Sequence, residues 1–196
     1  GHAMGRGHQL RRRVVEIQRA RTTLRREGYA VLRGVLPPMS IAIMRTYFRE
    51  REANGYLMAN DLQADRFVAH DDLLLQFVHR QTGTMIQSLS EQRVVPSYSY
   101  VSAYMEKAEL PRHRDRAQCV WNASVLIDST LDAPDGSGWP IFLETPAGLS
   151  TVDLAFGDMV VYSGVDRPHW RKRLRRGRQT LGLLHYVPPT FTGDLA

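Results

Sequence analysis

The 196-residue sequence contains few cysteines, few lysines and no long apolar runs. Its one cysteine, Cys119, cannot form an internal disulfide, and no apolar segment precedes a cleavage site near the N-terminus. We therefore expect a protein of the reducing cytoplasm. No run reaches the roughly 18 apolar residues that a membrane-spanning helix needs. A disulfide-stapled secreted scaffold and a membrane protein are both disfavoured.

Lysine is nearly absent from the basic residues: apart from Lys107 and Lys172, they are all arginines, and the net charge is +6. Such a charge permits an acidic partner without identifying one, and the codon bias of a GC-rich genome also produces it. The arginines are spread along the chain, with no basic and aromatic motif suited to base stacking. Nucleic acid is therefore a disfavoured partner.

The composition is that of an ordinary globular protein, with 43% hydrophobic and 23% charged residues. Residues 1–3 resemble a cloning remnant ahead of Met4, and we expect a single domain over 4–196. Its helical part is expected at about 9–90 and its β-rich core at about 93–188. No repeat or long linker divides the chain.

Helical periodicity predicts three helices in the N-terminal half, over residues 9–26, 39–51 and about 71–89. The first ends at Gly28, and a strand and turn over 29–36 follow it before Pro37. We expect Leu73, Leu74, Phe77, Met85, Ile86 and Leu89 to form the apolar side of the third helix.

After Ser90 short apolar runs alternate with turn residues, which is typical of strands. The predicted strands cover residues 97–106, 118–128, 140–144, 151–156, 159–162 and 181–187. This spacing predicts an α+β protein in which a double-sheet jelly roll carries helices packed outside one sheet.

A candidate metal site lies between two of these strands. His113 and Asp115 are separated by one residue, so in extended backbone their side chains point to the same face. His169, at the start of another expected strand, supplies a second imidazole. Two histidines and one carboxylate that leave other positions open are the ligand set of non-haem Fe(II) oxygenases.

A second His-x-Asp pattern, His70 to Asp72, falls where the third helix begins. Asp71 or Asp72 has a sufficient role there as a helix cap, so we interpret this pattern as structural.

Arg178 and Thr180 lead into the apolar strand at 181–187. A guanidinium on such a strand is costly to bury unless it meets a carboxylate, and Thr180 would add a hydroxyl on the same face. The preceding basic run, residues 171–177, is expected to be mostly exposed to solvent.

The ordered set His113-x-Asp115, the turn and strand at 156–162, His169 and Arg178-x-Thr180 resembles the Fe(II)- and 2-oxoglutarate-dependent dioxygenase superfamily. Within it, the chain resembles the prolyl 4-hydroxylase and phytanoyl-CoA hydroxylase branches, and the resemblance covers about residues 25–190. It implies a double-stranded β-helix of the cupin-like, jelly-roll kind.

By the same resemblance, His113, Asp115 and His169 bind Fe(II), Arg178 holds the distal carboxylate of 2-oxoglutarate, and O2 is the oxidant. Tyr104 is a further candidate beside the cosubstrate, with Thr180. Tyr98, Tyr100, Ser102 and Tyr104 share one face of their strand, which lines a polar pocket or forms an outer surface.

The resemblance implies a hydroxylase acting on a peptide, an amino acid or a small natural product, with release of succinate and CO2. Asp115 favours hydroxylation, since related halogenases replace this carboxylate with a small residue. The residues after Tyr104 depart from the prolyl-hydroxylase pattern, so a prolyl substrate is not implied. Two alternatives stay open, an oxidative nucleic-acid demethylase and a non-catalytic jelly-roll module that binds a metal. Substrate identity and oligomeric state are also open.

Substrate contacts are expected from Trp121, Trp139, Arg114, Arg116 or the loop at 132–138. The two tryptophans are alternatively packing residues, and the loop is alternatively a flexible turn.

Overall fold

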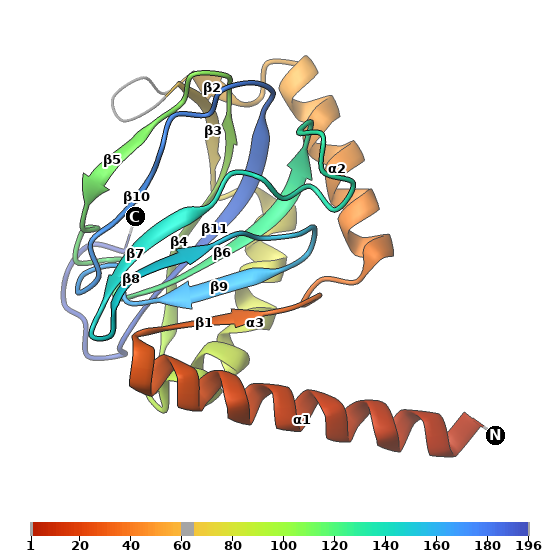
Figure 1. Cartoon of the computed structure of the whole chain (residues 1–196), viewed down its shortest axis with the longest axis vertical. Helices are drawn as coiled ribbons and strands as arrows, with labels where there is room; N and C mark the ends of the chain where they lie inside the picture. Colours follow the sequence, from red (N-terminus) through yellow and green to blue (C-terminus); the bar gives the residue numbers. More distant parts are fainter. Residues whose placement is uncertain (1, 60–64, 196) are drawn as a thin grey trace.

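The fold combines three helices with two antiparallel sheets in a computed structural model that describes residues 2–59 and 65–195, with side chains from residue 13 onward. The helices are α1 (His2–Glu27), α2 (Pro38–Ala53) and α3 (Leu73–Ser90) (Figure 1). The strands are β1 (Tyr29–Leu32), β2 (Met58–Ala59), β3 (Arg66–His70), β4 (Val95–Tyr104), β5 (Leu110–His113), β6 (Trp121–Ser129), β7 (Ile141–Thr145), β8 (Gly148–Val152), β9 (Met159–Tyr162), β10 (His169–Arg171) and β11 (Gln179–Val187).

The two sheets face each other. The large sheet has the strand order β1-β9-β6-β11-β4-β3-β2, and the small sheet has the order β5-β10-β7-β8. Figure 1 shows the helices along one side of the large sheet and the small sheet on its other side. This arrangement confirms the predicted α+β jelly roll, with helices packed on one sheet.

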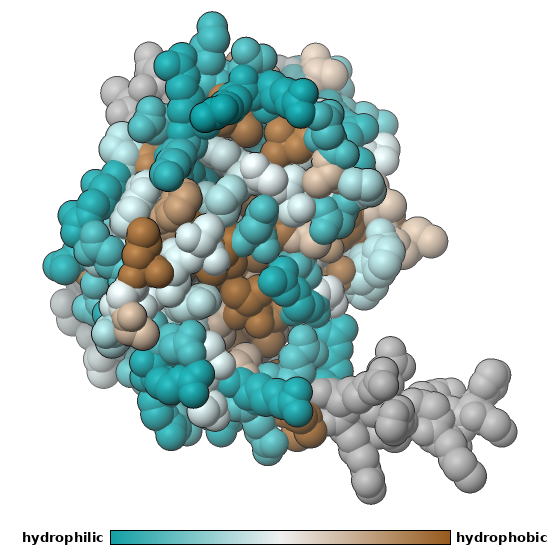
Figure 2. All heavy atoms as spheres, viewed as in Figure 1, coloured by the Kyte–Doolittle hydropathy of each residue, from teal (hydrophilic) through white to brown (hydrophobic). Residues whose placement is uncertain are grey.

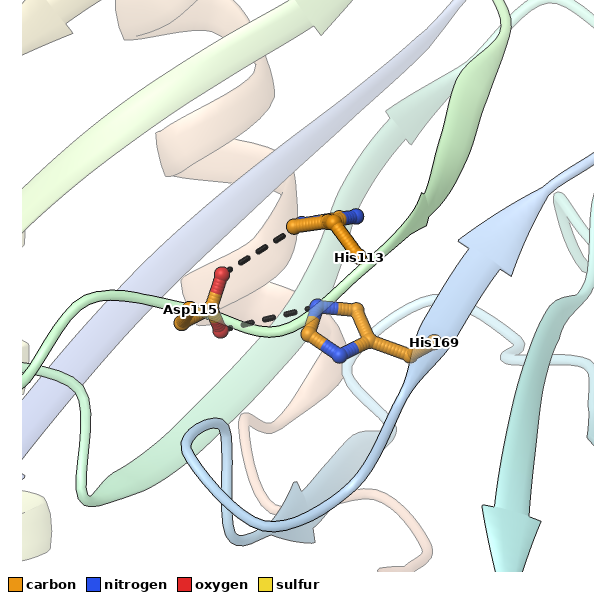
Figure 3. Close-up of side chains that lie close together, drawn as sticks. All are labelled: His113, Asp115 and His169. Carbon is orange, nitrogen blue, oxygen red and sulfur yellow. Dashed lines mark ion pairs between the residues drawn. The ribbon is translucent and has the colours of Figure 1, made fainter.

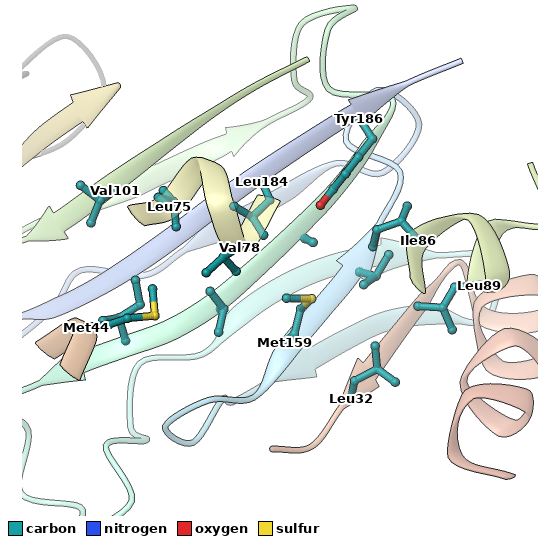
Figure 4. Close-up of a cluster of buried hydrophobic side chains, with 14 of the residues drawn as sticks. Leu32, Met44, Leu75, Val78, Ile86, Leu89, Val101, Met159, Leu184 and Tyr186 are labelled. Carbon is teal, nitrogen blue, oxygen red and sulfur yellow. The ribbon is translucent and has the colours of Figure 1, made fainter. Parts of the chain in front are cut away.

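Alternation along the strands divides the core into two layers. On β4 and β6, Val101, Ala103, Val125 and Ile127 face the helices, where Leu75, Ile86 and Leu89 of α3 pack against the sheet (Figure 4). Tyr104, Leu126, Val160 and Leu181 belong to the layer between the sheets, with Leu143 of the small sheet. The second layer surrounds the candidate site.

The ends of the first and third helices follow the sequence signals. Gly28 ends α1 with a φ of +80°, a left-handed conformation that suits glycine. The side chain of Asp72 accepts hydrogen bonds from the backbone amides of Leu74 and Leu75 at the start of α3. Asp72 is therefore a helix cap, as the sequence predicts.

Three details of the sequence prediction are wrong. Leu73 and Phe77 are 80% and 62% exposed, because the buried stripe of α3 begins at Leu75 and continues through Val78. Strands β2 and β3 lie inside the region expected to be helical. The strand expected at 151–156 is β8, which ends at Val152, because Ala155 donates its backbone N–H to the Asp158 carboxylate in a turn.

The surface view shows hydrophilic residues around most of the rim of one face, with apolar residues mainly toward its middle (Figure 2). Within the described residues, no helix is both long enough and apolar enough to span a membrane.

Candidate metal centre

Two neighbouring strands of the small sheet bring the predicted metal ligands together. His113 ends β5 and His169 begins β10, and the two residues are directly paired in the antiparallel register. Asp115 follows β5, where its backbone N–H donates to the carbonyl of Gly164 at 2.9 Å. Figure 3 shows the three side chains pointing toward one another.

The three side chains converge closely enough to hold one metal ion. Nε2 of His113 lies 3.3 Å from Oδ1 of Asp115, and Nε2 of His169 lies 3.5 Å from Oδ2. All three ligand atoms lie within 4.8 Å of one another. This donor set, two imidazoles and a carboxylate, suits a ferrous ion with further positions open.

Backbone carbonyls orient both imidazoles. Nδ1 of His113 lies 2.7 Å from the carbonyl oxygen of Pro111, and Nδ1 of His169 lies 2.9 Å from that of Arg167. When each Nδ1–H donates to its carbonyl, each Nε2 presents a lone pair toward Asp115. In both histidines, the backbone carbonyl two residues earlier in the chain orients the ring so that Nε2 can bind a metal ion.

Burial and mutual charge shift the pKa values of the three residues. Burial lowers the pKa of His169 below its usual value, against the charge of Asp115. At His113 burial is the largest single influence and acts downward, but the hydrogen bonds with Asp115 and the Pro111 carbonyl, together with the charge of Asp115, raise the pKa on balance. Burial acts upward on Asp115, yet both histidines and Asn122 lower its pKa on balance. Asp115 is thus an ionised ligand at neutral pH.

Two further residues hold Asp115 in place. The side-chain amide of Asn122, on β6, donates to Oδ2 of Asp115. Gly164 leaves the space that the carboxylate occupies, since a Cβ at residue 164 would lie 2.5 Å from that same oxygen. Such supporting groups fix the orientation of a metal ligand.

A narrow inner cavity of about 40 Å³ extends from the three residues into the barrel. Tyr104 lines it, and the Tyr104 hydroxyl lies 3.1 Å from Nη1 of Arg66, which donates to it. Tyr104 thus lines the same cavity as the candidate metal ligands.

Arg178 and Thr180 lie away from this cavity. Nη1 of Arg178 is 2.7 Å from both carboxylate oxygens of Glu52 on α2, and Nη2 is 3.5 Å from Asp128 on β6. Thr180 is buried opposite Asp128 in the register of β11 and β6. The residues that line the cavity on β11 are instead Leu181, Leu183 and His185. The structure therefore does not bring Arg178 and Thr180 to the candidate metal centre.

The sequence analysis missed two arginines that do line the inner cavity, Arg66 of β3 and Arg171 of β10. Arg171 belongs to the run expected to be exposed, yet it is only 4% exposed. The sequence does hold a signal for Arg171: it is separated from His169 by one residue on the same strand, and such residues share a face.

A second cavity of about 300 Å³ adjoins the first, with which it shares Arg66, Tyr100, His113, Asp115 and His185. Its other lining residues are His70, Tyr98, Arg114, Arg116 and Cys119. Tyr98 and Tyr100 of the tyrosine face predicted on β4 therefore line a polar pocket, and Arg114 and Arg116 also line it.

The other expected substrate contacts lie elsewhere. Nε1 of Trp121 donates to the side chain of Gln92, and Trp139 is a buried core residue. The loop at 132–138 contributes to a separate cavity of about 420 Å³, which has no lining residue in common with the metal centre.

Comparisons with known proteins identify relatives by fold. No family model and no curated protein matches the sequence. Among solved structures, a prolyl hydroxylase from Trichoplax adhaerens, in complex with a hypoxia-inducible-factor peptide, superposes with a TM-score of 0.75 at 13% identity, covering 91% of this chain and 92% of that one. AviO1 from Streptomyces viridochromogenes gives 0.70 at 20% identity, covering 90% and 97%.

HygX from Streptomyces hygroscopicus, solved with nickel and 2-oxoglutarate bound, gives a TM-score of 0.69 at 13% identity, covering 89% of this chain and 88% of that one. These similarities confirm that the chain has the fold of the 2-oxoglutarate and Fe(II) oxygenases. The chemistry must be argued from the site.

Proposed function

We propose that this protein is an Fe(II)- and 2-oxoglutarate-dependent dioxygenase that hydroxylates a C–H bond of an amino acid, a small natural product or a peptide. The observation that supports it best is the convergence of Nε2 of His113, Nε2 of His169 and the Asp115 carboxylate within 4.8 Å. The fold shared with HygX, which binds nickel and 2-oxoglutarate, supports the same assignment.

In this assignment His113, Asp115 and His169 hold the iron on one side and leave the positions facing the two cavities open. Iron, 2-oxoglutarate and O2 supply the oxidising chemistry, and succinate, CO2 and the hydroxylated product leave. The Pro111 and Arg167 carbonyls keep the imidazoles oriented, while Asn122 holds Asp115. The protein contributes positioning and exclusion of water.

The outer cavity is the place for the substrate. Its volume of about 300 Å³ is at the lower end of the range for small-molecule sites, about 300–1,000 Å³. Arg114 and Arg116 lie at its wall, and Asp115 is its only acidic lining residue. This size and charge favour an amino acid or another small anionic compound, or one side chain of a peptide, as the group that enters.

The test is an anaerobic titration of the metal-free protein with Fe(II) and then 2-oxoglutarate, followed through the visible charge-transfer band of the chelated cosubstrate. We expect a band in the wild type and none in His169→Ala. A protein that binds zinc tightly but develops no band with Fe(II) and 2-oxoglutarate would be the non-catalytic jelly-roll module instead.

A further inference from the structure

Arg171 is a buried cation at the inner end of the candidate site. It lies on β10 two residues after His169, is 4% exposed and lines the inner cavity with the metal ligands. Its Nη1 donates to the carbonyl oxygen of Trp139, and its Cζ lies 4.8 Å from the centroid of the Trp139 ring. Among the described residues, no carboxylate lies within 4.0 Å of its guanidinium.

A buried arginine normally has an acidic partner, and Arg171 has none among the described residues. A buried guanidinium needs a carboxylate or a comparable set of acceptors, and one carbonyl oxygen and one aromatic ring satisfy only part of its five N–H donors. The remaining donors can be satisfied by an anion that enters from the cavity.

The surroundings of Arg171 favour an anion. Asp115 is the only acidic residue among those that line the inner cavity, and it is committed to the metal ligand set. Tyr104 packs on the same Trp139 ring as Arg171, with ring centroids 5.0 Å apart, and it lines the same cavity as Arg171. Arg66 adds a second positive charge at this wall.

The dimensions suit a short dicarboxylate. Residues 169 and 171 are two positions apart on a strand, a spacing of about 7 Å. The end carbons of a five-carbon chain are about 5 Å apart, given bonds of about 1.5 Å. A ligand with one end at the metal can thus reach Arg171 with the other. A space of 40 Å³ also exceeds the roughly 15 Å³ that one water needs, so it admits a carboxylate group.

We propose that Arg171, and not Arg178, binds the distal carboxylate of 2-oxoglutarate, with the Tyr104 hydroxyl beside it. This inference rests on the proposed function and places the carboxylate receptor on the same strand as the second histidine ligand. Arg178 is already neutralised by Glu52 and Asp128 on the other face of the large sheet.

Two matched variants test the proposal, Arg171→Gln and Arg178→Gln. In the anaerobic titration of the Fe(II)-loaded protein, Arg171→Gln should raise the 2-oxoglutarate concentration at half-saturation by at least about 30-fold, as expected when one partner of a buried charge pair is removed. Fe(II) binding itself should stay within a few-fold of wild type. Arg178→Gln should change the half-saturating concentration by less than about 3-fold. The reverse pattern would overturn the assignment.

A ligand comparison in the wild-type protein does not depend on how a variant folds. 2-Oxobutyrate keeps the metal-chelating keto acid but lacks the distal carboxylate, so it should bind wild type at least about 30-fold more weakly than 2-oxoglutarate. In Arg171→Gln this preference should nearly vanish, whereas Arg171→Lys should retain part of it. An undiminished preference in a folded Arg171→Gln would place the receptor elsewhere.

Thermal unfolding of the Fe(II)-loaded protein gives a second readout. Since a ligand stabilises the state that binds it, 2-oxoglutarate should raise the Tm of wild type and Arg178→Gln but not that of Arg171→Gln at the same concentration. Failure of the proposed function looks different: the wild type itself would then show neither a band nor a shift in Tm.

Discussion

Arg171 ends β10 and Arg178 immediately precedes β11, but their side chains lie on opposite sides of the large sheet, and among the described residues only Arg178 has carboxylates as neighbours. Arg178 contacts Glu52 and Asp128, whereas Arg171 has a carbonyl oxygen and an aromatic ring. On the side of the large sheet that faces the helices, carboxylates of the protein itself neutralise Arg178. On the side that faces the small sheet, Arg171 needs an anionic ligand to neutralise it. The surroundings of Arg178 therefore suit stability, and those of Arg171 suit binding.

Asp128 is the centre of the outer cluster. It is 2% exposed, and its carboxylate accepts hydrogen bonds from Arg45 at 3.1 Å and Arg49 at 2.6 and 2.8 Å, both on α2. Together with Arg178 these residues attach α2 to β6 and β11. Asp115 contacts His113, His169 and Asn122 and, within the described residues, attaches no helix to the sheet. Mutation of the two aspartates therefore compares a residue of the candidate site with a residue that stabilises the fold.

The largest expected effect is on metal binding, from Asp115→Ala. Loss of the only carboxylate ligand should lower Fe(II) affinity by at least about 100-fold, while the unfolding free energy of the metal-free protein changes by no more than about 1 kcal/mol. Isothermal titration under anaerobic conditions measures the first quantity and urea unfolding the second. Retained Fe(II) affinity would show that the metal centre is not where we place it.

Asp128→Asn should give the opposite pattern. Breaking a buried ion pair costs about 3–5 kcal/mol, and since Arg45 and Arg49 are partly exposed we expect about 2–4 kcal/mol less unfolding free energy in urea. Fe(II) affinity should be unchanged. Glu144→Gln is the control, because its pair with Arg112 is exposed to solvent and should contribute little to the unfolding free energy. Equal losses in both variants would contradict the assigned role of Asp128.

Gly164→Ala should weaken the inner site without removing a ligand. The new Cβ would lie 2.6 Å from the Cys119 carbonyl oxygen, which cannot move easily, and 2.5 Å from Oδ2 of Asp115, which must then shift. Fe(II) affinity should fall by about 10–100-fold, the usual cost of disturbing a supporting residue.

Gly83→Ala serves as its matched control. In α3 the added methyl group meets only Tyr186 at 3.7 Å, so metal affinity should not change and helix propensity should add up to about 1 kcal/mol of stability. If Gly164→Ala binds Fe(II) as well as Gly83→Ala does, the close approach of Gly164 to Asp115 does not matter for binding.

The smallest effect concerns pH. Burial acts to raise the pKa of Asp128, but the hydrogen bond and charge of Arg49 and the charge of Arg45 lower it on balance. A carboxyl with a depressed pKa in the folded state stabilises the protein above its unfolded pKa of about 4, and this stabilisation is lost as pH falls toward the folded value.

The gap in unfolding free energy between wild type and Asp128→Asn should therefore shrink on acidification from about pH 5 downward. Each unit by which the pKa is depressed corresponds to about 1.4 kcal/mol. Urea unfolding of both proteins at pH 7, 5 and 3.5 measures the gap. A gap that stays constant over this range would mean that the ion pairs of Asp128 do not stabilise the fold.

Local patterns predicted much of the fold and the three residues that converge at the candidate metal centre. The strand over residues 159–162 has the bounds expected from its apolar run, and Asp72 caps α3 as its position predicts. The spacing of His113 and Asp115 predicted that both side chains point the same way, and both do point toward His169, although β5 ends at His113 and Asp115 lies just beyond it. The strands β2 and β3 were missed because strands of two and five residues carry little periodic signal.

The sequence by itself determined which residues share a face: Arg178 with Thr180, and His169 with Arg171. Only the tertiary structure decided which of these faces lies inside the barrel, because the alternation of side chains along a strand does not by itself show which face is turned inward. The acids that neutralise Arg178 come from α2 and β6, 126 and 50 residues away in the chain, and no local pattern reports such partners. Burial of a charge depends on those distant partners, so only folding could assign one arginine to the scaffold and leave the other facing the metal centre.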